Sequence, residues 1–236
     1  MRRRIPALVA CFGATVLLAG CIGAEGKQAE TLLRRAALAQ DGVTSERFVL
    51  RLDVETGGES MTMAMQGGAY LKGPSAGDFY LKLTGSAGSE GGPLNASIMQ
   101  RGNVAAIEED GRAERIPVSE AEEEFGSPTD MLDLARYVKS VSVDGTRLRD
   151  RPADRIVGIL DTKALLESSG ELTTKLLGEA GVHLSDIRAV LFVPRDTHLV
   201  EVMFADFDVT VHGEKAHVHL SVALSDFDKP VPIPPF

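Results

Sequence analysis

Three histidines near the end of the chain are the residues whose type and spacing most nearly match those of a metal-binding site. His217 and His219 stand two residues apart in an alternating segment, so their side chains point to the same side of a strand. His212 lies across a short turn, and three converging imidazoles would form a zinc-type site. However, Val218 and Leu220 belong to the apolar side of the same segment, which puts the histidines on its solvated side. We therefore predict no metal site.

Three common enzyme motifs are absent from the sequence. It contains no H-E-x-x-H, G-x-x-x-x-G-K-[ST] or G-x-G-x-x-G segment, so zinc protease, phosphate-loop and dinucleotide sites lack their working parts. Ser86 and Ser89 lie in the glycine-rich segment 85–93, which we interpret as a loop without a nucleophile. The acidic run of residues 120–124 lacks the alternation of an EF-hand. We predict no catalytic residues and no cofactor.

Cys21 is the residue with the clearest chemical role. Three arginines at positions 2–4 precede an apolar run over residues 5–18, which is too short for a membrane span and typical of a signal peptide. The segment Leu18-Ala19-Gly20-Cys21 resembles the bacterial lipoprotein signal, in which the cysteine is acylated on sulfur and becomes the first mature residue. The alternative is an ordinary secretory signal with an incidental cysteine. We expect a lipid-anchored protein on the extracytoplasmic face of the cell membrane.

Removal of the signal fixes the composition of the mature chain. Twenty of the 236 residues are lost, and three arginines go with them, which lowers the formal net charge from −9 to −12. An acidic surface of this kind argues against nucleic acid as a partner. Cys11 also lies in the signal, so the mature chain has no second cysteine with which to form an internal disulfide. Membrane attachment is therefore expected to depend on the acyl chains, and a protein partner stays undefined.

The spacing of apolar residues predicts a helix followed by a meander of strands. Small and apolar residues recur at helical spacing between positions 29 and 37, and Asp41-Gly42 ends that pattern. Alternation predicts strands around residues 48–54, 61–65 and 79–83, with Gly57-Gly58 as a hairpin turn. Further strands are expected at 97–107, 141–150, 155–160, 187–193, 199–204, 207–212 and 216–224, and further helices at 128–138 and 161–177.

The apolar positions of these strands predict one broad face that a ligand would contact. Three methionines alternate on one strand, and such unbranched, polarizable side chains adapt to irregular apolar ligands, although core packing is the simpler role for each. Few helices are available to cover the sheet, and a curved sheet with incomplete cover leaves an apolar concavity. The candidate ligand-binding residues are Phe48, Leu50, Leu52, Met61, Met63, Met65, Phe79, Leu81, Leu83, Val202, Phe204, Val209, Val211, Val218 and Leu220.

The order of these parts resembles a known family. The acylated cysteine, the segment Gly42-Val43-Thr44-Ser45, the segment Asp161-Thr162-Lys163-Ala164-Leu165-Leu166 and the ending from Leu224 to Pro235 are similar to actinobacterial envelope lipoproteins of the LppX/LprG type. The resemblance implies the α+β, LolA-like fold, in which a strongly curved antiparallel half-barrel has helices on its open, apolar concave side. It also implies lipid or lipidated cargo in the cavity between them.

The resemblance leaves two classes of function open. In the first, the protein binds and carries lipids or other hydrophobic molecules. In the second, the same fold serves as an envelope sensor or protein-interaction module whose cavity is filled by side chains. The methionines favour the carrier. We expect a signal peptide at 1–20, an acylated tether at 21–26 and one domain over 27–236.

Overall fold

The computed structural model describes residues 26–57, 59–87, 93–109, 111–119, 137–162, 183–184, 187–211 and 214–235. The signal peptide, Cys21, the acidic run at 120–124 and His212 fall outside these ranges. So do nearly all residues of the two helices predicted at 128–138 and 161–177.

One helix within the described residues spans positions 26–40. Alanine and leucine dominate it, and both favour helical backbone. Its end is closed by backbone bonds, with the N–H of Asp41 donating to the carbonyl of Ala37 and that of Gly42 to Ala39, each at 2.9 Å. The predicted first helix and its end at Asp41-Gly42 are confirmed.

Within the described ranges, twelve strands form a single antiparallel sheet. Their bounds are β1 (Ser45–Thr56), β2 (Glu59–Tyr70), β3 (Phe79–Ala87), β4 (Pro93–Arg101), β5 (Val104–Glu109), β6 (Arg112–Pro117), β7 (Val138–Leu148), β8 (Arg151–Leu160), β9 (His183–Leu184), β10 (Arg188–Pro194), β11 (Val202–Val211) and β12 (Glu214–Ser225).

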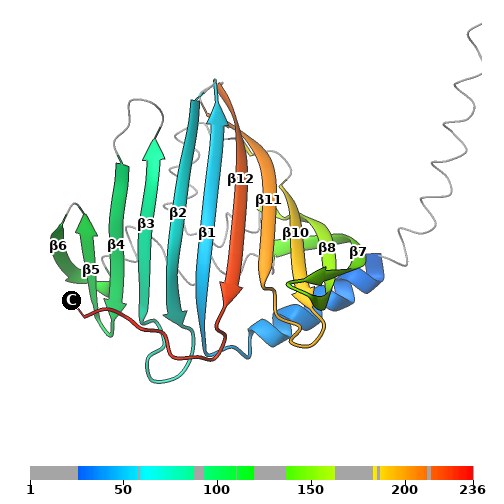
Figure 1. Ribbon diagram of the computed structural model, residues 1–236, viewed down its shortest axis with the longest axis horizontal. Helices are drawn as coiled ribbons and strands as arrows, with labels where there is room; N and C mark the ends of the chain where they lie inside the picture. Colours follow the sequence, from blue (N-terminus) through cyan, green and yellow to red (C-terminus); the bar gives the residue numbers. More distant parts are fainter. Residues whose placement is uncertain are drawn as a thin grey trace, which may run out of the picture.

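The strand order shows how the sheet is assembled. It runs β6-β5-β4-β3-β2-β1-β12-β11-β10-β8-β7, with the short β9 paired to β11. The last long strand, β12, therefore lies beside β1 at the middle of the sheet and joins an N-terminal meander to a C-terminal one (Figure 1). The sheet bends and does not close. The predicted α+β architecture with a curved antiparallel half-barrel is confirmed.

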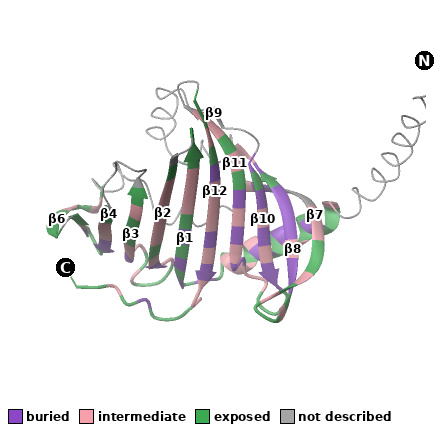
Figure 2. Cartoon of the chain, turned by 45° about the horizontal axis from the view of Figure 1, so that its top comes forward, coloured by how far each residue is buried: buried purple, intermediate pink, exposed green. Residues whose placement is uncertain are grey.

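The core lies between the helix and the β1 to β8 half of the sheet. Ala29, Leu33 and Ala36 on the helix are at most 9% exposed and belong to the same cluster as Ile156 and Leu191, which are completely buried. We call the side of the sheet that faces this cluster the inner face and the opposite side the outer face. Figure 2 shows the burial concentrated at the end of the sheet where the helix lies.

Three predicted elements need correction. The segments 199–204 and 207–212 are not two strands, because β11 runs without a break from Val202 to Val211. Val138 does not end a helix, since it begins β7. Gly85 does not begin a loop, because β3 continues to Ala87. In β11 and β3, polar or small residues interrupt the sequence pattern although the ladder of hydrogen bonds continues.

Candidate binding face of the sheet

Met61, Met63 and Met65 lie on the inner face of β2. The antiparallel register pairs them with Val54, Leu52 and Leu50 of β1, respectively. Directly opposed side chains in an antiparallel pair have Cβ atoms about 5 Å apart, so each methionine packs beside an aliphatic residue. The three pairs form a continuous apolar row across the hairpin, as the alternation predicted.

The next strand extends this row. Leu83 pairs with Met65 and Leu81 with Gly67, and on the far side Leu81 pairs with Ile98 of β4. Gly85 pairs with Met63, which leaves the position beside that methionine without a side chain. Gly85 therefore belongs to the apolar face itself and gives Met63 room on one side.

Burial divides the inner face into two parts. Under the helix, residues such as Met203, Ala205 and Val222 are no more than 4% exposed and form a closed core. On the β1 to β4 side a second group of apolar residues is only half-buried (Figure 2). We call this second part the half-buried apolar face; its members are Leu52, Val54, Met61, Met63, Met65, Leu81, Leu83 and Ile98.

The other candidate ligand-binding residues of β1, β3 and β12 also lie on the inner face. Phe48, Leu50, Phe79 and Val218 are buried and therefore serve the closed packing, whereas Leu220 is half-buried. On β11, Val209 pairs with Ala216 and is half-buried, and Val211 pairs with Glu214 at the end of the strand.

Val202 and Phe204 were wrongly assigned to this face. Val202 pairs with Ala223 and Phe204 with Ser221, whereas the inner residues Val222 and Leu220 pair with Met203 and Ala205. Because β11 is one strand, its even-numbered residues point outward along its whole length, and Phe204 lies on the outer face. Met203 and Ala205 take the inner positions.

A polar pair lies beneath the end of the helix. Glu46 of β1 is only 1% exposed, and the side-chain N–H of Gln40 donates to its Oε2 at 2.8 Å. Glu46 pairs in register with Ala69, which places it on the inner side of the sheet. This contact ties the last turn of the helix to the first strand, and the sequence analysis did not anticipate it.

His217 and His219 lie on the outer face, where they pair with carboxylates across the strands. The Nδ1 atom of His219 is 2.5 Å from Oδ1 of Asp206, and that of His217 is 3.0 Å from Oδ1 of Asp208. The hydrogen bond to Asp208 raises the pKa of His217 above its usual value. Both imidazoles are substantially exposed. Over the described part of the chain, no group of three or more potential ligands is arranged to hold a metal ion.

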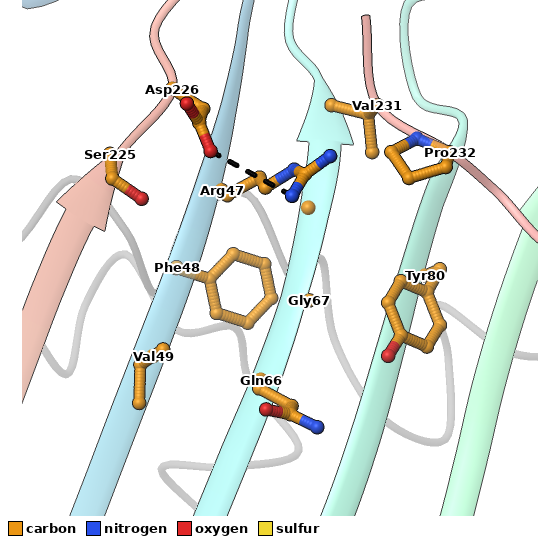
Figure 3. Close-up of a pocket in the computed structure, with 11 residues that line it drawn as sticks. Arg47, Phe48, Val49, Gln66, Gly67, Tyr80, Ser225, Asp226, Val231 and Pro232 are labelled. Carbon is orange, nitrogen blue, oxygen red and sulfur yellow. Dashed lines mark ion pairs between the residues drawn. The ribbon is translucent and has the colours of Figure 1, made fainter.

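A pocket of about 420 Å³ lies on the outer side of the sheet, where the C-terminal segment crosses β1 to β3. Figure 3 shows Arg47, Tyr80 and Asp226 around it, with Val231 and Pro232 of the C-terminal segment at its edge. Arg47 and Asp226 approach to 3.7 Å, and Lys229 together with Arg47 lowers the pKa of the Asp226 carboxyl. Phe48, one of the predicted ligand-contacting residues, also lines this pocket, which the sequence did not predict.

Comparison with known proteins shows which solved structures are similar to this one. No protein-family model matches the chain, and no curated protein matches it in sequence. Among solved structures, LprF from Mycobacterium bovis is 12% identical, with 89% of this chain and 97% of LprF covered and a TM-score of 0.56. The chain has the fold of LprF. The Mycobacterium tuberculosis lipoprotein LppX also matches, with 13% identity, 88% and 99% coverage and a TM-score of 0.49.

The fold shared with LprF agrees with the architecture that the sequence predicts. The architecture that the resemblance implied, a curved antiparallel half-barrel with a helix on its inner side, is shared with LprF. In the described ranges, no helix is long and apolar enough to cross a bilayer.

Ile98 and Val54 are members of this face that the sequence analysis missed as candidates. Val54 is the fourth apolar residue of the β1 alternation, so continuing that pattern by one step would have found it. Ile98 stands between Ser97 and Met99, where alternation is weak, and only its pairing with Leu81 reveals its side.

Proposed function

We propose that the protein is an envelope lipoprotein that carries lipids or other hydrophobic molecules on its half-buried apolar face. Acylation of Cys21 would hold it on the extracytoplasmic face of the cell membrane. The single observation that carries the proposal is the contrast within one inner face: a closed core under the helix continues into apolar side chains that stay half-exposed.

The energetics favour an acyl chain as occupant. Each methylene moved from water onto an apolar surface contributes about 0.8 kcal/mol, so a long chain laid along these residues gains a substantial binding free energy. The three methionines have flexible, unbranched side chains that adjust to chains of different length or branching. This chemistry gives affinity for a class of molecules and little selectivity within it.

Two features support cargo binding over simple core packing. Gly85 places no side chain beside Met63, and the apolar residues around Met63 are not fully buried, unlike the cluster below the helix. The fold shared with LprF also agrees with the sequence resemblance, which implies lipid cargo in a cavity of the half-barrel.

Identification of co-purified molecules tests the function directly. The protein, purified from its own membrane, is weighed intact by native mass spectrometry, and an organic extract of the same sample is analysed for lipids. We expect a lipid adduct that disappears after extraction. Met63→Trp, which fills the space beside Gly85, should reduce the adduct, whereas Ala64→Trp on the outer face should retain it.

The sensor or protein-interaction alternative makes the opposite prediction. If the wild-type protein carries no lipid and binds no acyl-chain probe, the inner face is filled and the carrier function is wrong.

A further inference from the structure

The helix of residues 26–40 has an outward face with an unusual composition. Leu38 is 67% exposed, the highest value among the exposed large apolar residues of the described chain. A single exposed leucine is ordinary on a protein surface. What distinguishes Leu38 is its place in the helix and the charges beside it.

Lys27, Thr31, Arg34 and Leu38 recur at steps of four, three and four residues, so their side chains form one line along the helix. All four are exposed. The buried line, which contains Ala29, Leu33 and Ala36, lies on the opposite side. The outward line can therefore contact another surface without disturbing the packing of the helix on the sheet.

The charge of this helix opposes that of the whole chain. Residues 26–40 contain three bases, Lys27, Arg34 and Arg35, and one acid, Glu30, whereas the chain has a net charge of −9. Arg35 is also exposed. An anionic surface would attract this helix and repel the acidic remainder, so it would orient the molecule with the helix facing it.

The position of the helix in the chain identifies that surface. Cys21 precedes the first helical residue, Gly26, by five positions, and five extended residues span at most about 18 Å. If Cys21 is acylated, the beginning of the helix cannot lie farther than this from the lipid headgroups. A contact that is too weak to recruit a free protein then suffices to orient a tethered one.

We propose that the outward face of this helix docks on the anionic membrane to which the chain is tethered, with Leu38 inserted among the headgroups and Arg34 and Arg35 paired with lipid phosphates. The proposal rests on the anchoring at Cys21 and goes beyond it, because acylation alone leaves the orientation of the domain free.

The composition of the chain permits a clean test. The sequence has no tryptophan, and the mature chain has Cys21 as its sole cysteine. The mature protein is coupled through that thiol to a maleimide lipid in vesicles of phosphatidylcholine mixed with phosphatidylglycerol. Because the tether is made chemically, the result does not depend on whether cells acylate Cys21, and failure of docking is distinguishable from failure of the anchor.

Single tryptophans then report contact with the bilayer. We expect the emission of Leu38→Trp to shift to the blue and to be quenched by brominated acyl chains. Val104→Trp, which replaces an exposed residue of β5 with 40% exposure, should show neither effect. In vesicles of phosphatidylcholine alone, or in high salt that shortens the screening length to about 3 Å, the Leu38→Trp signal should be lost.

Charge reversal supplies the matched control. Adding Arg34→Glu and Arg35→Glu to Leu38→Trp should reduce the docked population at least about tenfold. Reversal of two exposed lysines elsewhere, Lys72→Glu and Lys82→Glu, should leave it unchanged. Circular dichroism confirms that each variant is folded. Equal quenching at positions 38 and 104, or quenching that survives reversal of both arginines, would overturn the proposal.

Discussion

The ring of Phe204 stacks on the imidazole of His219, with ring centroids 6.1 Å apart and planes inclined by 25°. His219 is a partly exposed residue of β12 whose Nδ1 contacts Asp206, so the stack lies on the outer face of the sheet. Phe192 of β10 meets Phe204 edge-on at 6.1 Å. The aromatic residue that appeared to belong to the ligand face thus takes part in an outer cluster of rings.

Phe204→Leu tests this assignment. The substitution removes the stack on His219 and leaves every inner-face residue in place, so the affinity for a fluorescent acyl-chain probe should stay within about twofold of the wild type. Fluorescence titration of both proteins gives the comparison. A loss of tenfold or more, about 1.4 kcal/mol of binding free energy, would return Phe204 to the ligand face.

Met63→Trp tests the half-buried apolar face itself. Overpacking of a closed core costs about 1–3 kcal/mol of folding free energy, but a half-buried position with an empty neighbour at Gly85 accepts the added volume. We therefore expect probe affinity to fall more than stability. Met63→Asp should lower both, because it places a charge in apolar surroundings.

Probe titration and urea unfolding measure the two effects on the same samples, with Ala64→Trp as the control on the outer face. If Met63→Trp is as destabilising as an insertion into a closed core, and wild-type protein binds no probe, the face is a packed interior.

His217 provides a pH-dependent prediction. Its pKa lies above the usual value of 6.5, chiefly because of the hydrogen bond with Asp208 and with smaller contributions from Asp206 and Glu55. A raised folded-state pKa means that the contribution of this pair to stability is fully present below pH 6.5 and is lost as the pH rises through the folded pKa. NMR titration of the imidazole should show the raised value, and Asp208→Asn should lower it. Titration of wild-type His217 at or below 6.5 would show that the pair does not form in solution.

The alternation of apolar residues predicted the central strands because each has one polar side. Phe48, Leu50 and Leu52 on β1 and the three methionines on β2 occupy the expected face, and their hairpin turns at Gly57, whose φ is +56°. The pattern failed on β11, where Val202, Met203 and Phe204 are all apolar and erase the difference between the two sides. The following residues, Ala205 to Val209, alternate with Asp206 and Asp208, and extending that alternation backwards selects Met203.

Other features could not be predicted because they depend on contacts between distant segments. The turn between β7 and β8 uses Arg149 and Asp150 at φ values of 48° and 66°, without the glycine or asparagine that would identify it. The burial gradient along the inner face depends on where the helix lies, and strand periodicity does not contain that information. The outer pocket exists because residues 226–235 return across the sheet.

Gly68 is a position of β2 where that returning segment comes close. A Cβ atom at position 68 would lie 2.7 Å from Cγ1 of Val231, and Tyr70 holds the same residue by accepting a hydrogen bond from its N–H at 3.0 Å. Gly68→Ala should therefore displace the C-terminal segment and cost about 1–3 kcal/mol. Limited proteolysis should cut the C-terminal segment faster in this variant, and Tyr70→Phe, which removes the hydroxyl alone, should have a smaller effect. Unchanged protection in Gly68→Ala would mean that Val231 does not pack there.

Cys21→Ala tests the anchor on which the cellular role depends. The four residues between Cys21 and the helix are few and weakly apolar, so the variant should appear in the soluble extracytoplasmic fraction after signal cleavage. Cys11→Ala is the matched control, because that cysteine leaves with the signal and its loss should not change fractionation. Intact mass should show the lipid modification on wild type and Cys11→Ala and its absence from Cys21→Ala. A cleaved Cys21→Ala protein that still fractionates with membranes, and resists extraction with high salt, would show that acylation of Cys21 is not what holds the protein there.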